Sequence, residues 1–181
     1  MPAPVRQVTE SGFKVSWPRS SSFRFADLAP YQQLSGCCLK EMDVGWYDVA
    51  KGHLVLLELK GSGVWDAFEK DIPTAHKHLV QNFEGKATDV LLILASVWAQ
   101  TDFGNSLAPL LPVNAPTFPG ASRLKLIFLV DTPPTRAPLL GAVKDELNRV
   151  LAGRVSMYGI RRVTLVDFER ARGLGLPVAR V

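Results

Sequence analysis

Cysteine is scarce in this chain of 181 residues: the only two are Cys37 and Cys38, which are adjacent. Neighbouring cysteines cannot form an ordinary structural disulfide without a strained ring, and two cysteines do not complete a structural zinc site without well-placed histidines. His76 and His78 are two residues apart, so a helix points them about 160° from each other. We therefore expect reduced, buried thiols and no zinc site.

Long apolar runs are also missing. No stretch approaches the roughly 18 uninterrupted apolar residues of a membrane span, and Met1–Gly12 holds no apolar signal-peptide segment. The glycine-rich stretch "KGSG" lacks the spacing of a phosphate-binding P-loop and its following lysine. These absences predict a cytoplasmic protein without a membrane partner and argue against nucleoside triphosphate binding.

The composition is that of a globular protein, with 47% hydrophobic and 21% charged residues. The length predicts one domain over residues 1–181, with a core at about 25–99, a proline-rich loop at 101–122 and an extension at 123–181. The net charge of +4 is concentrated after residue 150, where the sequence has six arginines and only two acidic residues. Of these, Arg161 and Arg162 are candidate contacts to phosphate, although an ordinary solvated surface explains such arginines equally well.

Hydrophobic periodicity predicts the elements. The stretch "GFKVSWP" predicts an edge strand that ends at Pro18, and Phe25–Gly36 a short helix. The sequence predicts two further strands, at Cys37–Asp48 and His53–Gly61, joined by the turn "VAKG". This arrangement indicates a hairpin, with Asp48 capping the turn. A helix is expected from Asp71 through Phe83, with Gly85 as its stop.

The second half continues this alternation of strands and helices. We expect strands at "DVLLILASVWA", "RLKLIFLVD" and, as the last one, "RRVTLVDF", with a long loop or flap over Thr101–Ser122 and a helix over Pro138–Ala152. The order predicts an α/β fold with a mixed β-sheet flanked by helices.

Two charges interrupt the apolar run "HLVLLELKG". Residues two apart in a strand point to the same face, so Glu58 and Lys60 project side by side. Glu41 and Asp43 stand in the same relation on the preceding strand, and an antiparallel pairing brings one of them across from Glu58. The residues leave open which of the two it is.

Such a cluster suits a hard cation. Mg²⁺ prefers oxygen ligands and keeps several waters, so Asp43, Glu58 and the carbonyl of Leu59 are candidate ligands. A bound metal polarises a phosphodiester and activates water, and Lys60 is placed to orient that water or to stabilise charge on the phosphate.

An acidic residue on one strand, followed by an aliphatic strand that ends in Glu-x-Lys and then by a helix, is the pattern in "MDVGWYD…HLVLLELKG". This pattern resembles the PD-(D/E)XK nuclease superfamily, most of all its Holliday-junction-resolvase and restriction-endonuclease-like members, over about residues 25–99. Met42 stands where the family often has proline. The resemblance implies a restriction-endonuclease-like core, Mg²⁺ or Mn²⁺ bound by Asp43 and Glu58, and Lys60 as the catalytic lysine. It also implies a polar contribution from the following helix, where Gln81 and Lys77 match by position.

A second Glu-x-Lys, Glu84-Gly85-Lys86, falls at the expected helix end, and we expect both of its charges to be solvated. Tryptophans 46, 65 and 98 are expected to pack in or around the core.

The functional hypothesis is a metal-dependent nuclease that hydrolyses phosphodiester bonds in DNA. A homodimer would match the two strands of a duplex. The alternatives are a non-catalytic binding module in which Glu58 and Lys60 form a structural ion pair, and a hydrolase of RNA or a nucleotide.

Overall fold

The computed structural model describes residues 5–181. The strands are β1 (Val5–Glu10), β2 (Phe13–Pro18), β3 (Ser22–Phe23), β4 (Val44–Asp48), β5 (His53–Lys60), β6 (Leu124–Val130), β7 (Thr164–Val166) and β8 (Val178–Arg180). The α-helices are α1 (Ala29–Leu34), α2 (Val64–Lys70), α3 (Ile72–Trp98), α4 (Asp102–Leu107), α5 (Ala137–Ser156) and α6 (Phe168–Gly173). Short 3₁₀ turns occupy Arg19–Ser21, Phe25–Asp27, Ser35–Cys37, Ala108–Leu110 and Pro134–Arg136.

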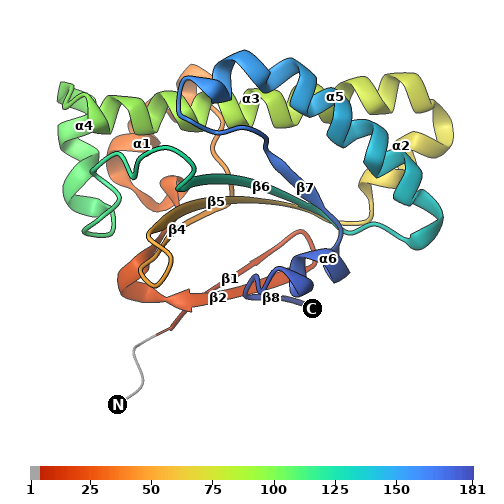
Figure 1. Ribbon diagram of the computed structural model, residues 1–181, viewed down its shortest axis with the longest axis horizontal. Coiled ribbons are helices and arrows are strands. Elements are labelled where there is room, and N and C mark those ends of the chain that lie inside the picture. Colours follow the sequence, from red (N-terminus) through yellow and green to blue (C-terminus); the bar gives the residue numbers. More distant parts are fainter. Residues whose placement is uncertain (1–4) are drawn as a thin grey trace.

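The main sheet has five strands in the order β3-β4-β5-β6-β7 (Figure 1). The β4–β5 pair is antiparallel, whereas β5, β6 and β7 run parallel. This arrangement confirms the predicted α/β fold with a mixed sheet flanked by helices. The predicted hairpin is also confirmed, although its first strand begins at Val44 and not at Cys37. Asp48 caps its turn by accepting a hydrogen bond from the Lys51 amide at 3.1 Å.

The central strand β5 is covered on both faces. Its side chains alternate: Leu54 and Leu56 belong to the hydrophobic cluster under the helices, and Val55, Leu57 and Leu59 belong to the cluster under the small sheet. In Figure 1, α3 and α5 lie along one face of the main sheet, and β1, β2, β8 and α6 lie along the other. The alternation sends Glu58 and Lys60 toward the helices.

The second sheet has three strands in the order β1-β2-β8. The predicted strand at "GFKVSWP" is present as β2, but it is the central strand and not an edge, because β8 pairs with its second side through Phe13 and Arg180. The strand β7 is therefore not the last one of the chain. This second partner of β2 lies more than 150 residues away in the chain, and local periodicity carries no information about it.

The helix α3 corrects two predictions. It continues through Gly85 to Trp98 and replaces the strand expected at "DVLLILASVWA". A glycine within a helix costs only about 1 kcal/mol, which burial of the helix face outweighs: Phe83, Val90 and Leu94 are fully buried, and Phe83 packs on Phe128 of β6 with ring centres 4.6 Å apart. A continuous apolar run fits a buried helix as well as a buried strand.

The segment 101–122 is not a free flap. Thr101 caps α4 by accepting a hydrogen bond from the Gly104 amide, and Leu107, Leu111 and Ala115 are buried in the core. Trp98 donates a hydrogen bond to the carbonyl of Ala115 at 3.1 Å, which ties the segment to α3. The prolines thus interrupt regular structure without releasing the segment from the core.

The prediction of buried thiols is wrong, since Cys37 and Cys38 are both free and exposed. They lie at the end of a 3₁₀ turn in the connection to β4, where Cys38 takes a left-handed conformation with φ 61°. The packing role expected for tryptophan is confirmed: Trp46 and Trp65 are buried, and the partly buried Trp98 packs against the core.

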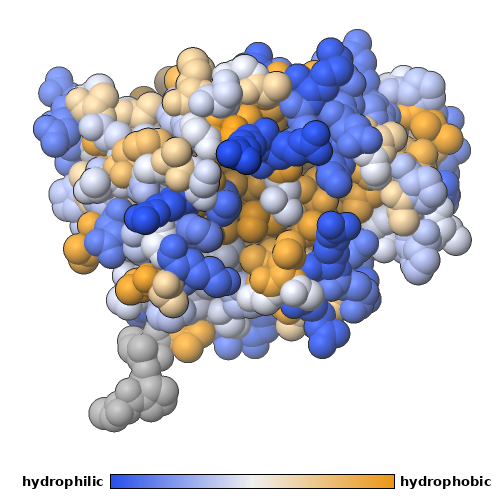
Figure 2. All heavy atoms as spheres, in the orientation of Figure 1, coloured by the Kyte–Doolittle hydropathy of each residue, from blue (hydrophilic) through white to orange (hydrophobic). Residues whose placement is uncertain are grey.

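The surface is mixed in character. On the face seen in Figure 2, hydrophilic residues dominate over α5, and hydrophobic residues show in a hollow between the helix layer and the small sheet. Within residues 5–181, none of the helices combines the length and the hydropathy needed to cross a membrane.

The contact between α4 and α3 is tight enough to predict a stability effect. A Cβ atom at Gly104 would lie 1.9 Å from the carbonyl oxygen of Ser96, whereas one at Gly141 of α5 meets no atom within 4 Å. Gly104→Ala should lower the free energy of unfolding by about 2 kcal/mol or more through overpacking. Gly141→Ala should raise it by up to about 1 kcal/mol. Urea unfolding of both variants tests this, and equal effects would contradict the described helix contact.

Candidate metal centre

A fully buried carboxylate lies near the end of β5. Glu58 has 0% relative exposure, and its side chain points toward α3. An ionised carboxylate in such a place needs partners, because burial of an unpaired charge is strongly unfavourable.

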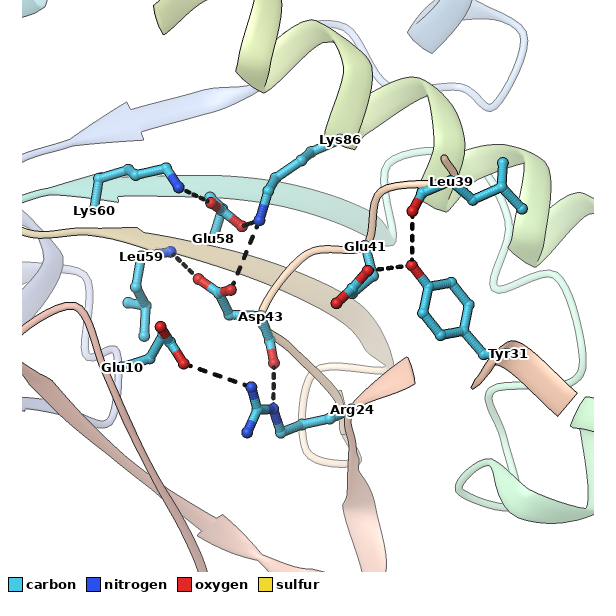
Figure 3. A network of polar contacts seen from close by, with 10 residues as sticks. All are labelled: Glu10, Arg24, Tyr31, Leu39, Glu41, Asp43, Glu58, Leu59, Lys60 and Lys86. Atoms are coloured by element: carbon cyan, nitrogen blue, oxygen red, sulfur yellow. Dashed lines mark hydrogen bonds and ion pairs between the residues drawn. The ribbon is translucent and has the colours of Figure 1, made fainter. Parts of the chain in front are cut away.

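Two lysines supply the positive charge (Figure 3). Lys60 Nζ lies 2.9 Å from Glu58 Oε1 in an ion pair that lacks hydrogen-bond geometry. Lys86 of α3 donates a hydrogen bond of 2.7 Å to Glu58 Oε2. The predicted side-by-side placement of Glu58 and Lys60 is confirmed, but Lys86 makes the more complete contact.

Asp43 completes the cluster. It directly precedes β4, in which Val44 pairs with Leu57, so it stands across from Glu58 at the end of the hairpin. Its Oδ1 lies 3.8 Å from Lys86 Nζ, and its Oδ2 accepts a hydrogen bond of 2.7 Å from the Leu59 amide. One ammonium therefore contacts both carboxylates.

Glu41 belongs to a different contact. It accepts a hydrogen bond from the hydroxyl of Tyr31, which also donates to the carbonyl of Leu39 at 3.0 Å. Burial first, and then Glu41, raises the pKa of Tyr31. Figure 3 shows Glu41 turned toward Tyr31, so of the two acids that the sequence left open, Asp43 is the one beside Glu58.

The backbone at Asp43 is anchored from below. Arg24 donates a hydrogen bond from Nε to the carbonyl of Asp43 at 3.1 Å and forms an ion pair with Glu10 of β1 at 3.6 Å. The turn between β1 and β2 also approaches the end of β5: a Cβ atom at Gly61 would lie 2.8 Å from the carbonyl oxygen of Ser11. The small sheet thus buttresses the cluster.

The electrostatics follow from burial. Burial first, and then the charge of Asp43, raises the pKa of Glu58 from 4.5 to about 6, against the opposing effect of the two lysines. Burial lowers the pKa of Lys86, but the charges of Glu58 and Asp43 outweigh it and leave that pKa raised. Lys86 is therefore held as an ammonium.

An open groove lies beside Lys60. It has a volume of about 310 Å³, lies between α2 and α3, and has Lys60 in its lining. Asn82 and His78 of α3 line it, and the buried Oδ1 of Asn82 finds no hydrogen-bond donor among residues 5–181. His76 lines a different groove, against α5, so the two histidines do not form a pair, as expected.

The structure separates Gln81 and Lys77 from the cluster. Both line the groove between α3 and α5, together with Glu146 and Val150. Gln81 is five residues before Lys86, or about 140° around the helix, and Lys77 is nine residues before it, or about 180°. The polar residue that does share the face of Lys86 is Asn82, one turn earlier.

The basic tail divides between the two ends of the sheet. Arg161 and Arg162 are exposed and directly precede β7. The strand register places Arg162 beside Lys125, at the start of β6. Lys60 lies beside Val130, at the other end of β6, about five residues or 17 Å along the strand. Arg180 lies at the same end as Lys60: it pairs with Asp131 at 2.8 Å, and the amide of Asp131 donates to the carbonyl of Lys60.

Lys86 and Asn82 are the site residues that the sequence analysis missed. Lys86 was expected to be solvated at a helix end, yet its side chain is only 16% exposed. The available signal was helical periodicity: Lys86 lies three residues after Phe83 and four before Val90, both fully buried. A lysine within an apolar stripe indicates a buried partner.

The donor set fits a hard divalent cation. Asp43 and Glu58 supply carboxylates, and Glu58 Oε1 accepts no hydrogen bond from the described residues. The N–H and C=O groups of one strand residue point to the same side of the strand. Because the Leu59 amide points toward Asp43, the Leu59 carbonyl also points to that side, where β5 has no β4 residue paired with it. No cluster of three or more His, Cys, Asp or Glu residues suited to a metal exists within residues 5–181, so water or substrate oxygens would have to complete the coordination.

Comparisons with protein-family models, with curated proteins and with solved structures found no match to this chain.

The pKa of Glu58 predicts how stability depends on pH. Because this pKa is about 6 in the folded protein, against 4.5 ordinarily, the folded state binds more protons between these values. The associated stabilisation is complete below pH 4.5 and is lost as the pH rises through about 6. A shift of this size corresponds to about 2 kcal/mol.

Urea unfolding at about pH 4.5 and pH 7 checks this. Between pH 4.5 and pH 7 the free energy of unfolding should fall by about 2 kcal/mol more in the wild type than in Glu58→Gln. An identical loss in both proteins would contradict the burial of an ionisable Glu58.

Proposed function

We propose that this protein is a Mg²⁺- or Mn²⁺-dependent nuclease that hydrolyses phosphodiester bonds in DNA. The observation that carries the proposal is the fully buried Glu58, with Asp43 across from it and, beside it, Lys60, which lines an open groove. A structural ion pair alone does not explain a second carboxylate in the same cluster.

Each residue has a defined part in this proposal. Asp43, Glu58 and the carbonyl of Leu59 would hold the metal, which when bound polarises the phosphodiester and lowers the pKa of a water. Lys60 reaches the groove with a side chain that is 29% exposed, and it would orient that water or stabilise charge on the phosphate. Asn82 adds a side-chain carbonyl oxygen, Oδ1, that can accept a hydrogen bond from a water.

DNA is the proposed substrate, and the cytoplasm the proposed location. The groove between α2 and α3 supports access of a phosphate to Lys60. Arg180 supports contact with a charged backbone at that end of the sheet, whereas Arg161 and Arg162 would meet only a substrate that extends around the molecule. A homodimer would present two such sites to the two strands of a duplex.

The second candidate function is a non-catalytic binding module that has the same fold. The observation in its favour is the position of Lys86, whose ammonium neutralises both carboxylates without a metal. Metal binding separates the two functions, because only the nuclease requires it.

Cleavage of supercoiled plasmid tests the proposal. The wild type with Mn²⁺ or Mg²⁺ should nick the plasmid, and chelation should stop the reaction. Glu58→Gln and Lys60→Ala should each lower the rate by at least about 100-fold, since each removes charge stabilisation at the reacting phosphate.

Gln81→Ala is the matched control, because Gln81 lies on the opposite side of α3 and its loss should leave the rate unchanged. Full activity in Glu58→Gln, or an inactive wild type that also binds no Mn²⁺, would refute the nuclease.

A further inference from the structure

The ammonium of Lys86 stands between the two carboxylates. It lies 2.7 Å from Glu58 Oε2 and 3.8 Å from Asp43 Oδ1, and its side chain is only 16% exposed. A divalent cation held by Asp43 and Glu58 would have to occupy this same space. Lysine and metal are therefore alternative occupants of one position.

Charge makes the two occupants exclusive. Asp43 and Glu58 carry two negative charges, which Lys60 and Lys86 balance when no metal is present. An added divalent ion beside Lys86 would leave an excess of positive charge in a poorly solvated cluster, where like charges repel strongly. If the Lys86 ammonium leaves, the two carboxylates, the divalent ion and Lys60 together carry a net charge of only +1.

Lys86 lies one helical turn after Asn82, which lines the open groove, so this groove lies next to the face of α3 that carries Lys86. A lysine side chain has a flexible chain of four carbons, so its ammonium can change position without a shift of the helix. Lys60, by contrast, is on the same strand as Glu58 and remains beside it.

We propose that Lys86 is a built-in counterion that fills the metal position of the free protein, and that metal binds only by displacing it. This inference rests on the proposed metal site. It makes Lys86 a determinant of metal affinity: the protein stays folded around its buried carboxylates without metal, at the expense of weaker metal binding.

Calorimetric Mn²⁺ titration of three proteins tests the inference. Lys86→Met removes the competing ammonium and should bind Mn²⁺ at least about tenfold more tightly than the wild type. Lys77→Met, a matched lysine on the opposite face of α3, should bind like the wild type. Weaker or equal binding by Lys86→Met would overturn the inference.

A measurement on the wild type alone avoids dependence on the folding of a variant. Acetylation with acetic anhydride, followed by peptide mass spectrometry, reports how accessible each amine is. Lys86 should react slowly in the free protein and several-fold faster with Mn²⁺ present, while Lys51, with its side chain 63% exposed, reacts equally in both. Unchanged protection of Lys86 in the Mn²⁺-bound protein would overturn the inference.

The outcomes separate this inference from the proposed function. If the wild type binds Mn²⁺ and Lys86→Met binds no more tightly, Lys86 is not the competitor, and the nuclease stands. If only Lys86→Met binds Mn²⁺, the inference holds, and the wild type is the non-catalytic module. If neither binds Mn²⁺ and no plasmid is nicked, both proposals fail.

Discussion

Burial of the Glu58 carboxylate is the constraint around which this structure is arranged. A charge with no solvent exposure survives only if other groups neutralise it, and here Lys60, Lys86 and the nearby Asp43 form a balanced cluster. A leucine at this position would fill the core without such partners. The strand, the helix and the loop before β4 are thus coupled through one side chain.

The sheet topology creates the space for this cluster. Because β5 extends beyond the start of β4, its last residues have no strand partner on that side, and the Leu59 amide bonds the side chain of Asp43 instead. On the other side, β6 pairs with β5 as far as Lys60. Arg24 and the small sheet hold the open side from below. The site therefore forms where an antiparallel pair ends within a mixed sheet.

Much of this could be predicted from local sequence. The hairpin and the shared face of Glu58 and Lys60 follow from a two-residue period and a glycine-bearing turn, and both are confirmed. The long helix α3 could not be assigned in the same way, since its apolar second half suits a buried strand equally well. That one error hid Lys86, because its burial is apparent only once the helix is known to continue past Gly85. The pairing of β8 with β2 depends on residues far apart in the chain, which no local period reveals.

Anomalous diffraction from crystals soaked in Mn²⁺ tests whether the end of β5 binds a metal, as we propose. We predict a peak at coordination distance from the carboxylates of Asp43 and Glu58 and from the carbonyl of Leu59, with the Lys86 ammonium moved away. A saturating soak that leaves no peak, with Lys86 still bonded to Glu58, would contradict this claim.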